Sequence, residues 1–196
     1  MEKKILLATG NSGKAAEILE VLGDLPFEFL TLKNLNLKND AAETGATFAE
    51  NAEIKARHFF AKTEIAAIGE DSGILVDALP GELGVKTRRF GAGENATDEK
   101  WLEFFLQKME NAPTRRAEFF CAAAFFNGKN CEIFSGRTAG ILLEKPAVKI
   151  PRGIPLSALF VPENFTKTFA ELSPAEKAAV SHRGKALSKL RKFLET

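Results

Sequence analysis

The sequence predicts an α/β fold with a mixed sheet, and three observations support it. In the first third of the 196-residue chain, short apolar runs alternate with segments of helical spacing, as in strands joined by helices. Two long β-rich segments follow, over 117–126 and 131–143, joined by a turn in which Gly128 follows Asn127. The length fits one domain over residues 1–196 with a cleft between its two halves.

The N-terminal elements follow from apolar spacing. A short apolar run over 4–8 predicts a buried strand, and the polar residues 9–13 predict a turn. Apolar residues then recur at helical spacing over 14–22, which predicts a helix. Residues 27–32 are predicted to form the second strand.

A capping box marks the next helix. Thr47 and Glu50 have the spacing that caps a helix start, and the helix is predicted to continue to about Lys62. The apolar residues 65–68 predict a strand, and the polar residues 70–73 with their glycine predict an acidic turn after it.

The second half adds elements around the hairpin. The pattern predicts a helix capped by Thr97, a strand over 156–161, a helix capped by Ser173, and a basic helix over 184–194.

The overall composition limits the function classes. Apolar residues make up 45% and charged residues 27% of the chain, which is typical of a soluble globular protein. The net charge of +1 gives no general attraction to nucleic acid or membrane, so neither is an expected partner. No apolar run approaches the ~20 residues of a membrane span. Cys121 and Cys131 lack metal-ligand spacing and read as ordinary thiols, so we expect a cytoplasmic protein.

The first candidate site is the turn that enters the first predicted helix. Backbone N–H groups at a helix N-terminus form an anion site, and Lys14 would add a positive charge. The stretch resembles a P-loop but fails at two defining positions, which hold Ala8 and Ala15. An ordinary strand-to-helix turn, capped by Asn11 or Ser12, explains the pattern equally well.

The second candidate is the acidic turn at Asp71. A carboxylate at the end of a buried strand is a common Mg²⁺ ligand, because the ion takes one or two carboxylates together with water and phosphate oxygens. The alternative is a turn in which Asp71 or Ser72 bonds its own backbone. Lys55, on the helix before this strand, would most simply be solvated.

A cationic cluster near the C-terminus is the third candidate. It contains Lys177, His182 and Arg183, and an arginine offers a planar fork of donors to phosphate or to a base edge. The alternatives are a solvated basic face or a nucleic-acid contact, although the aromatic residues typical of such contacts are missing there.

Together and in this order, these segments resemble the inosine triphosphate pyrophosphatase family of house-cleaning nucleoside triphosphate pyrophosphohydrolases. The resemblance extends over nearly the whole chain and rests on residues 8–14, 43–45, 47–56, 70–74, 96–98, 176–177 and 181–184. It implies a two-lobed fold around a long twisted mixed sheet with a central substrate cleft. It also implies a homodimer and Mg²⁺-dependent cleavage of a nucleoside triphosphate into a monophosphate and pyrophosphate, with ITP, dITP and XTP as preferred substrates.

The resemblance also implies roles for individual residues. Asp71 would bind Mg²⁺ and orient or deprotonate the attacking water, and Glu43 would complete the metal site. Lys55 would neutralise phosphate charge and Ser72 would contact the substrate. The remaining substrate-binding residues would be Thr9, Gly10, Asn11, Ser12, Gly13, Lys14, Lys177, His182 and Arg183.

The chain departs from the family where the base is expected. The family has a Gly-Phe-Gly-Tyr/Trp-Asp-Pro segment, whereas this chain has Ile154, Leu156 and Ser157 at the two aromatic positions and the aspartate. Loss of aromatic stacking, worth roughly 1–3 kcal/mol, would weaken base binding. Three outcomes stay open: retained activity on deaminated purines, a shift to other nucleotides as in the related Maf-type pyrophosphatases, or a catalytically weak nucleotide-binding paralogue.

Overall fold

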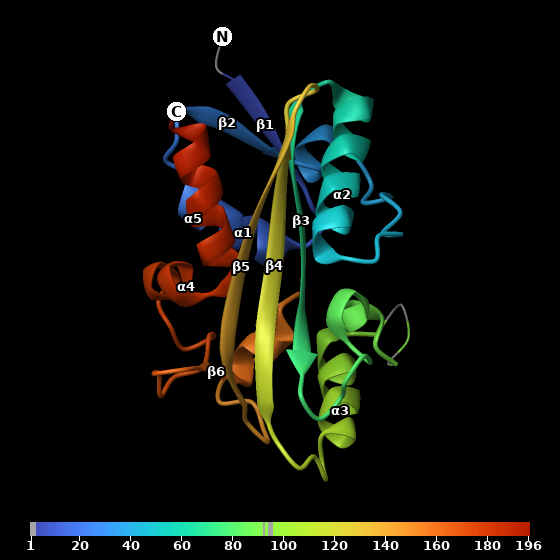
Figure 1. The fold of residues 1–196 in the computed structure, drawn as a ribbon, viewed down its shortest axis with the longest axis vertical. Helices are drawn as coiled ribbons and strands as arrows, with labels where there is room; N and C mark the ends of the chain where they lie inside the picture. Colours follow the sequence, from blue (N-terminus) through green and yellow to red (C-terminus); the bar gives the residue numbers. More distant parts are fainter. Residues whose placement is uncertain (1–2, 92, 94–95) are drawn as a thin grey trace.

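A six-stranded mixed sheet organises the molecule, in the strand order β2-β1-β3-β4-β5-β6 (Figure 1). The computed structural model describes residues 3–91, 93 and 96–196, without the side chains of residues 88 and 89. The strands are β1 (Lys3–Ala8), β2 (Phe27–Thr31), β3 (Ala66–Val76), β4 (Arg116–Phe126), β5 (Cys131–Leu142) and β6 (Phe160–Pro162). The α-helices are α1 (Ser12–Leu22), α2 (Phe48–Thr63), α3 (Asp98–Lys108), α4 (Pro174–Val180) and α5 (His182–Leu194). Short 3-10 helices cover η1 (Lys33–Leu35), η2 (Gly84–Arg89) and η3 (Pro155–Ala158).

The sheet confirms the predicted mixture of strand directions. β1 runs parallel to β2 and β3, while β3, β4, β5 and β6 are joined by antiparallel pairing. β3 pairs with β1 only up to Gly69, but it pairs with β4 from Ala67 to Val76. The second half of β3 therefore has one edge that is not paired with β1, and this edge adjoins the loop that follows β1.

The predicted acidic turn over 70–73 is wrong, because these residues lie inside β3. Polar residues with a glycine are typical of turns, but pairing with β4 continues through all of them. Successive side chains of a strand point to opposite faces. Glu70 and Asp71 consequently contact different sets of residues on opposite faces of the sheet.

Two boundaries near the C-terminus also differ from the prediction. Residues 156–158 belong to η3 and not to a strand, since Pro155 lacks a backbone N–H and begins the helical turn. Only Phe160–Pro162 forms the predicted strand. α5 begins at His182, two residues earlier than the predicted Gly184, because the Ser181 side chain caps it by accepting the Gly184 N–H at 3.0 Å.

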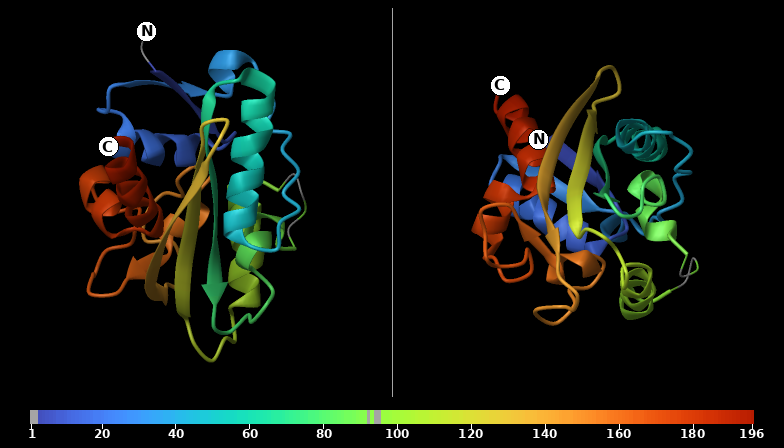
Figure 2. Two further views of the ribbon diagram at one scale, coloured as in Figure 1. Left: turned by 45° about the horizontal axis from the view of Figure 1, so that its top comes forward. Right: turned by 60° about the horizontal axis from the view of Figure 1, so that its bottom comes forward.

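Separate apolar cores divide the molecule into two lobes, as the sequence predicts. In the first, α2 packs on one face of the sheet and α1 and α5 pack on the other (Figures 1 and 2). In the second, α3, η3 and β6 surround a core that contains Trp101, Phe105, Phe160 and Phe169. The long strands β3, β4 and β5 pass through both lobes (Figure 2).

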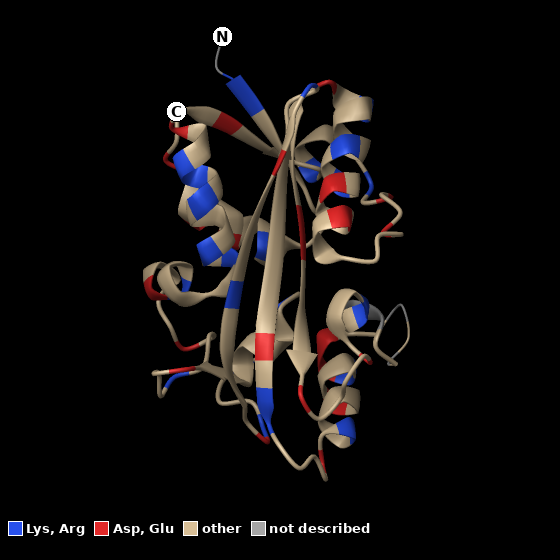
Figure 3. Cartoon of the chain, viewed as in Figure 1, with Lys and Arg blue, Asp and Glu red and all other residues tan. Residues whose placement is uncertain are grey.

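Basic residues recur along α5 (Figure 3), and several of their side chains bond to other parts of the chain. Lys185 donates to the Arg137 carbonyl at 2.9 Å, and Lys189 donates to the Ser135 carbonyl at 2.7 Å. Arg191 binds Asp24 through both carboxylate oxygens. The side chains of Lys185, Lys189 and Arg191 thus have a structural role. Among the described residues, no helix is both long enough and apolar enough to cross a membrane.

Candidate active site

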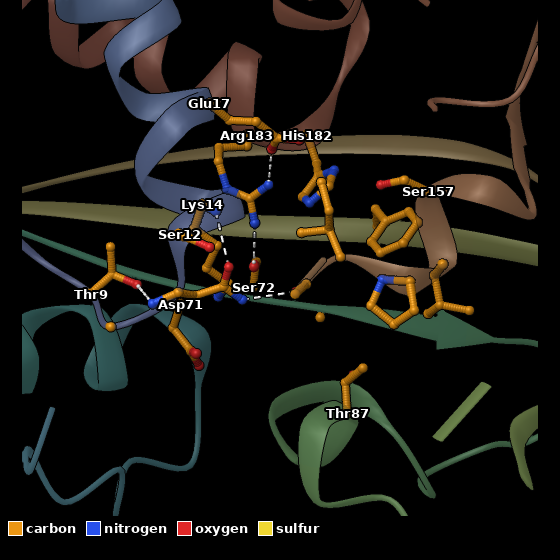
Figure 4. Close-up of a pocket in the computed structure, with 18 of the residues that line it drawn as sticks. Thr9, Ser12, Lys14, Glu17, Asp71, Ser72, Thr87, Ser157, His182 and Arg183 are labelled. Carbon is orange, nitrogen blue, oxygen red and sulfur yellow. Dashed lines mark hydrogen bonds and ion pairs between the residues drawn. The ribbon is translucent and has the colours of Figure 1, made fainter. Parts of the chain in front are cut away.

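A cleft of about 650 Å³ lies between the lobes, and residues from both lobes line it. Figure 4 shows its polar side chains, with Thr9 and Asp71 toward one end and Ser157 toward the other. Of the thirteen residues proposed from the sequence, twelve line the cleft: Thr9, Gly10, Asn11, Ser12, Lys14, Glu43, Lys55, Asp71, Ser72, Lys177, His182 and Arg183. Gly13 lies in the same loop but is not among the lining residues.

The loop after β1 is fixed by Asn11, which caps α1. Its Oδ1 accepts the Gly13 N–H at 2.9 Å and the Lys14 N–H at 3.1 Å, so Asn11 and not Ser12 is the cap. The Asn11 Nδ2 donates to the Gly153 carbonyl at 2.8 Å. A Cβ on Gly13 would lie 2.8 Å from the Arg152 carbonyl oxygen, so glycine permits this close approach. The loop is therefore held against the segment that precedes η3.

Asp71 lies on the α2 face of β3, among polar groups from α2. Its Oδ1 accepts from the Lys55 Nζ at 3.1 Å, and its Oδ2 accepts from the Asn51 Nδ2 at 3.2 Å. Burial raises the pKa of Asp71, and the charge of Lys55 only partly opposes this rise. The carboxylate is thus fixed at both oxygens in a partly dehydrated position.

Lys55 is buried and not solvated. Only 5% of the residue is exposed, and its Nζ lies 2.7 Å from Glu43 Oε1 and 3.1 Å from the Glu70 carbonyl oxygen. Burial alone would lower the pKa of Lys55, but Asp71 and Glu43 outweigh it and raise the pKa. Lys55 is therefore a fixed positive charge between two carboxylates.

Glu70 occupies the opposite face of β3, where α1 and α5 meet. Its carboxylate lies 2.8 Å from the Lys14 Nζ and 3.2 Å from an Arg183 nitrogen, and its side chain is 0% exposed. Burial would raise the pKa of Glu70, but the charges of Arg183 and Lys14 outweigh it and hold the pKa well below its usual range. Glu70 is therefore ionised and orients both cations.

Arg183 joins this buried network to the cleft. The terminal nitrogen Nη2, which lies 3.2 Å from Glu70, also donates to the Ser72 hydroxyl at 2.9 Å, and Nη1 pairs with Glu17 on α1. Glu17 also pairs with Lys177 of α4, so one carboxylate holds two of the predicted substrate-binding cations.

His182 and Lys177 lie toward the Ser157 end of the cleft. The His182 ring stacks on Phe119, with ring centroids 4.6 Å apart, and its buried Nδ1 has no hydrogen-bond partner in the described part of the chain. Burial and the charge of Arg183 lower the pKa of His182 well below its usual range, so the ring is neutral. The Lys177 Nζ lies 3.4 Å from the Ser157 hydroxyl.

The sequence reasoning missed three residues that orient the site: Glu17, Asn51 and Glu70. Glu17 lies one helical turn after Lys14, and this spacing is the sequence signal that could have identified Glu17. Asn51 lies one turn before Lys55, and Glu70 adjoins Asp71 on the same strand. Each acts by holding another side chain, a role that carries no motif of its own.

The carboxylate set is compatible with a divalent cation held jointly with phosphate. Among the described residues, no group of three or more His, Cys, Asp and Glu side chains could hold a metal. Glu43 and Asp71 nevertheless converge on one point, where the Lys55 ammonium is bound. Mg²⁺ needs only one or two protein carboxylates when phosphate oxygens and water complete its shell. These donors therefore fit Mg²⁺ bound together with a phosphate ligand.

Known proteins resemble this chain over nearly its full length. It is 37% identical over 196 residues to the dITP/XTP pyrophosphatase of Leptospira interrogans serogroup Icterohaemorrhagiae serovar Lai, covering 100% of this chain and 99% of the relative. It is 42% identical to that of Vibrio parahaemolyticus, covering 96% and 94%. The structures of a HAM1 protein from Coxiella burnetii (TM-score 0.82, 38% identity) and of the Staphylococcus aureus Ham1 protein (TM-score 0.81, 32% identity) each align over 98% of both chains. A sequence model of the Ham1 family matches residues 5–193, and the chain therefore belongs to the Ham1 family.

Proposed function

We propose that the protein hydrolyses nucleoside triphosphates with a deaminated purine base, such as ITP, dITP and XTP, to the monophosphate and pyrophosphate. The observation that carries this proposal is the convergence of Asp71, Glu43 and Lys55 beside the Lys14 loop, at one end of a cleft whose other end combines apolar and polar side chains. The relatives named dITP/XTP pyrophosphatase support the same activity.

The triphosphate would lie along the loop after β1. Lys14 and Lys55 would contribute positive charge, and the hydroxyl groups of Thr9, Ser12 and Ser72 would contribute hydrogen bonds. Lys14 is held by Glu70 with its side chain still 18% exposed, so it can reach a ligand without leaving its partner. Phosphoryl hydrolysis depends mainly on positioning and charge stabilisation, which this arrangement supplies.

Asp71 would accept the proton of the attacking water or orient that water. Asn51 and Lys55 each hold one of its oxygens, so the direction of the carboxylate is set before substrate arrives. Glu43 and Asp71 would hold Mg²⁺, which when bound would neutralise phosphate charge and activate water. Lys55 would then interact with phosphate oxygens in addition to the two carboxylates.

The base would occupy the end of the cleft near Ser157. Apolar side chains of Ile154, Leu156 and Phe169 line it, and the His182 ring lies beside them. A slot that joins such apolar side chains to the polar groups of Ser157 and Lys177 is suited to a flat heterocycle with polar edges. The substitutions at Ile154, Leu156 and Ser157 favour a second candidate function, pyrophosphohydrolysis with altered base selectivity or weak turnover.

Pyrophosphate release from a nucleotide panel tests the proposal. We expect release from ITP, dITP and XTP with Mg²⁺ and none after EDTA treatment, whereas ATP, GTP, dTTP, UTP and CTP should react much more slowly. A preference for another base would support altered selectivity. Nucleotide binding without any release would overturn the proposed hydrolysis.

Replacing Ile154 with phenylalanine is expected to strengthen ITP binding. The side chain lines the cleft, and base–aromatic stacking is worth ~1–3 kcal/mol, so KM for ITP should fall by roughly 5- to 150-fold with kcat little changed. Steady-state kinetics would measure it, with Val148→Phe, an exposed position outside the cleft lining, as the control. An unchanged KM would mean that the base does not lie against Ile154.

We also propose a cytoplasmic homodimer. The family resemblance supports this assembly, and a chain without disulfides among its described residues is compatible with a reducing compartment.

A further inference from the structure

Trp101 in the first turn of α3 carries a buried hydrogen-bond donor with no acceptor. It is the chain's single tryptophan, and only 2% of the residue is exposed. Its indole stacks flat on Phe105, with centroids 5.5 Å apart and an interplanar angle of 8°. The Nε1 atom has no hydrogen-bond partner within the described residues. Buried tryptophan N–H groups usually find a partner, so this one needs an explanation.

Packing accounts for the ring of Trp101 but not for its N–H. The neighbouring core is made of apolar side chains, including Phe105, Leu156 and Phe169, and none of them offers an acceptor to the indole N–H. Trp101 also lines the cleft. The residue that carries this buried, unpaired donor therefore borders the ligand cleft, where a bound ligand would supply the missing acceptor.

Trp101 lies at the base end of the cleft. It shares its core with Leu156, which stands where the family has its second aromatic residue. Asp98, one helical turn earlier, accepts the Gly153 N–H at 2.6 Å and so fixes the start of α3 to the segment that carries Ile154. The indole is therefore held beside the positions at which this chain departs from its family.

We propose that Trp101 is a specificity-determining residue whose indole N–H donates a hydrogen bond to the exocyclic 6-oxo oxygen of a purine base. This inference rests on the proposed function. The 6-oxo oxygen is the exocyclic acceptor that hypoxanthine and xanthine share, and an indole N–H can only donate. Adenine presents an amino donor at the same position, so Trp101 would reject it. Guanine also has a 6-oxo oxygen, and Trp101 would not distinguish it from hypoxanthine.

The variant Trp101→Phe keeps an aromatic ring beside Phe105 and removes the donor together with part of the indole volume, and a substrate without the acceptor separates these two effects. We expect kcat/KM for ITP to fall about 3- to 10-fold, the size expected for one neutral hydrogen bond. With purine riboside triphosphate, which lacks the 6-oxo group, the variant and the wild type should be equal. Phe104→Leu, on the same helix but outside the cleft lining, should leave both substrates unaffected. An equal loss on both substrates would show a packing role and overturn the proposal.

A second measurement uses the unmodified protein. A single tryptophan gives one indole N–H signal in a ¹⁵N-correlated NMR spectrum. Non-hydrolysable α,β-methylene ITP should move the indole proton downfield, and the corresponding purine riboside analogue should not. If ITP is hydrolysed but this signal does not distinguish the two analogues, the role of Trp101 is wrong and the proposed function stands. If the wild type hydrolyses no nucleotide and the signal responds to none, both proposals fail.

Discussion

Replacing Asp71 with asparagine is expected to lower kcat for ITP hydrolysis by roughly 10²- to 10⁴-fold, the range for loss of a principal proton-transfer group. Asparagine has nearly the same shape, so the fold should be retained. It cannot accept a proton at neutral pH, and it removes one of the two carboxylates that converge on Lys55. Pyrophosphate release at saturating ITP and Mg²⁺ would measure the change, with circular dichroism as the check on folding.

The matched control for this experiment is Asp77→Asn. Asp77 follows the last residue of the same strand and is exposed, outside the residues that line the cleft. The charge change is identical, so the control should retain the wild-type rate. If Asp71→Asn also retained it, the activity would come from a contaminant or from a different catalytic group.

The sequence predicts this fold best where the stabilising contact is local. The capping boxes at Thr47–Glu50 and Ser173–Glu176 are both present, with each side chain bonded as the pattern requires. Asn11 similarly caps α1 through the backbone N–H groups two and three residues later. In all three cases the partners lie within one helical turn, so the residue pattern alone contains the interaction.

The extension of β3 past Ile68 could not be predicted in the same way. Residues 70–73 are polar and end in glycine, which locally favours a turn, yet they pair with β4 residues far along the chain. Tertiary pairing overrides local propensity here. The same cause explains Lys55: on an isolated helix it would be solvated, but Glu43 and Asp71, brought together by folding, enclose its ammonium group.

The family resemblance identified most of the groups that face the cleft, but not Glu17, Asn51 and Glu70, which hold several of them in place. Alternation along β3 is the physical reason that neighbouring carboxylates have different surroundings. Asp71 meets α2 and the cleft, while Glu70 meets cations from α1 and α5 beneath it. Had residues 70–73 been predicted as a strand, alternation would have placed Glu70 and Asp71 on opposite faces of the sheet. The predicted turn implies no such alternation, so it could not distinguish their roles.

Replacing Glu70 with glutamine is expected to lower the free energy of unfolding by about 3–5 kcal/mol, as when one partner of a buried ion pair is removed. The neutral side chain leaves the charges of Lys14 and Arg183 without their shared carboxylate. For a chain of this size the change corresponds to a fall in Tm of roughly 6–20 °C. Urea unfolding followed by circular dichroism, together with calorimetry, would measure both quantities.

Glu28→Gln makes the same charge change in an exposed ion pair with Lys4, whose side chain is 52% exposed. Exposed pairs contribute ~0–1 kcal/mol, so this control should unfold almost as the wild type does. If Glu70→Gln were equally harmless, Glu17 alone would suffice to neutralise Arg183, and the carboxylate of Glu70 would not be needed to hold the network together. A large loss of unfolding free energy in Glu70→Gln alone would instead show that Lys14 and Arg183 depend on the carboxylate beneath them. The stability of the first lobe and the arrangement of its phosphate-binding side chains would then rest on the same contacts.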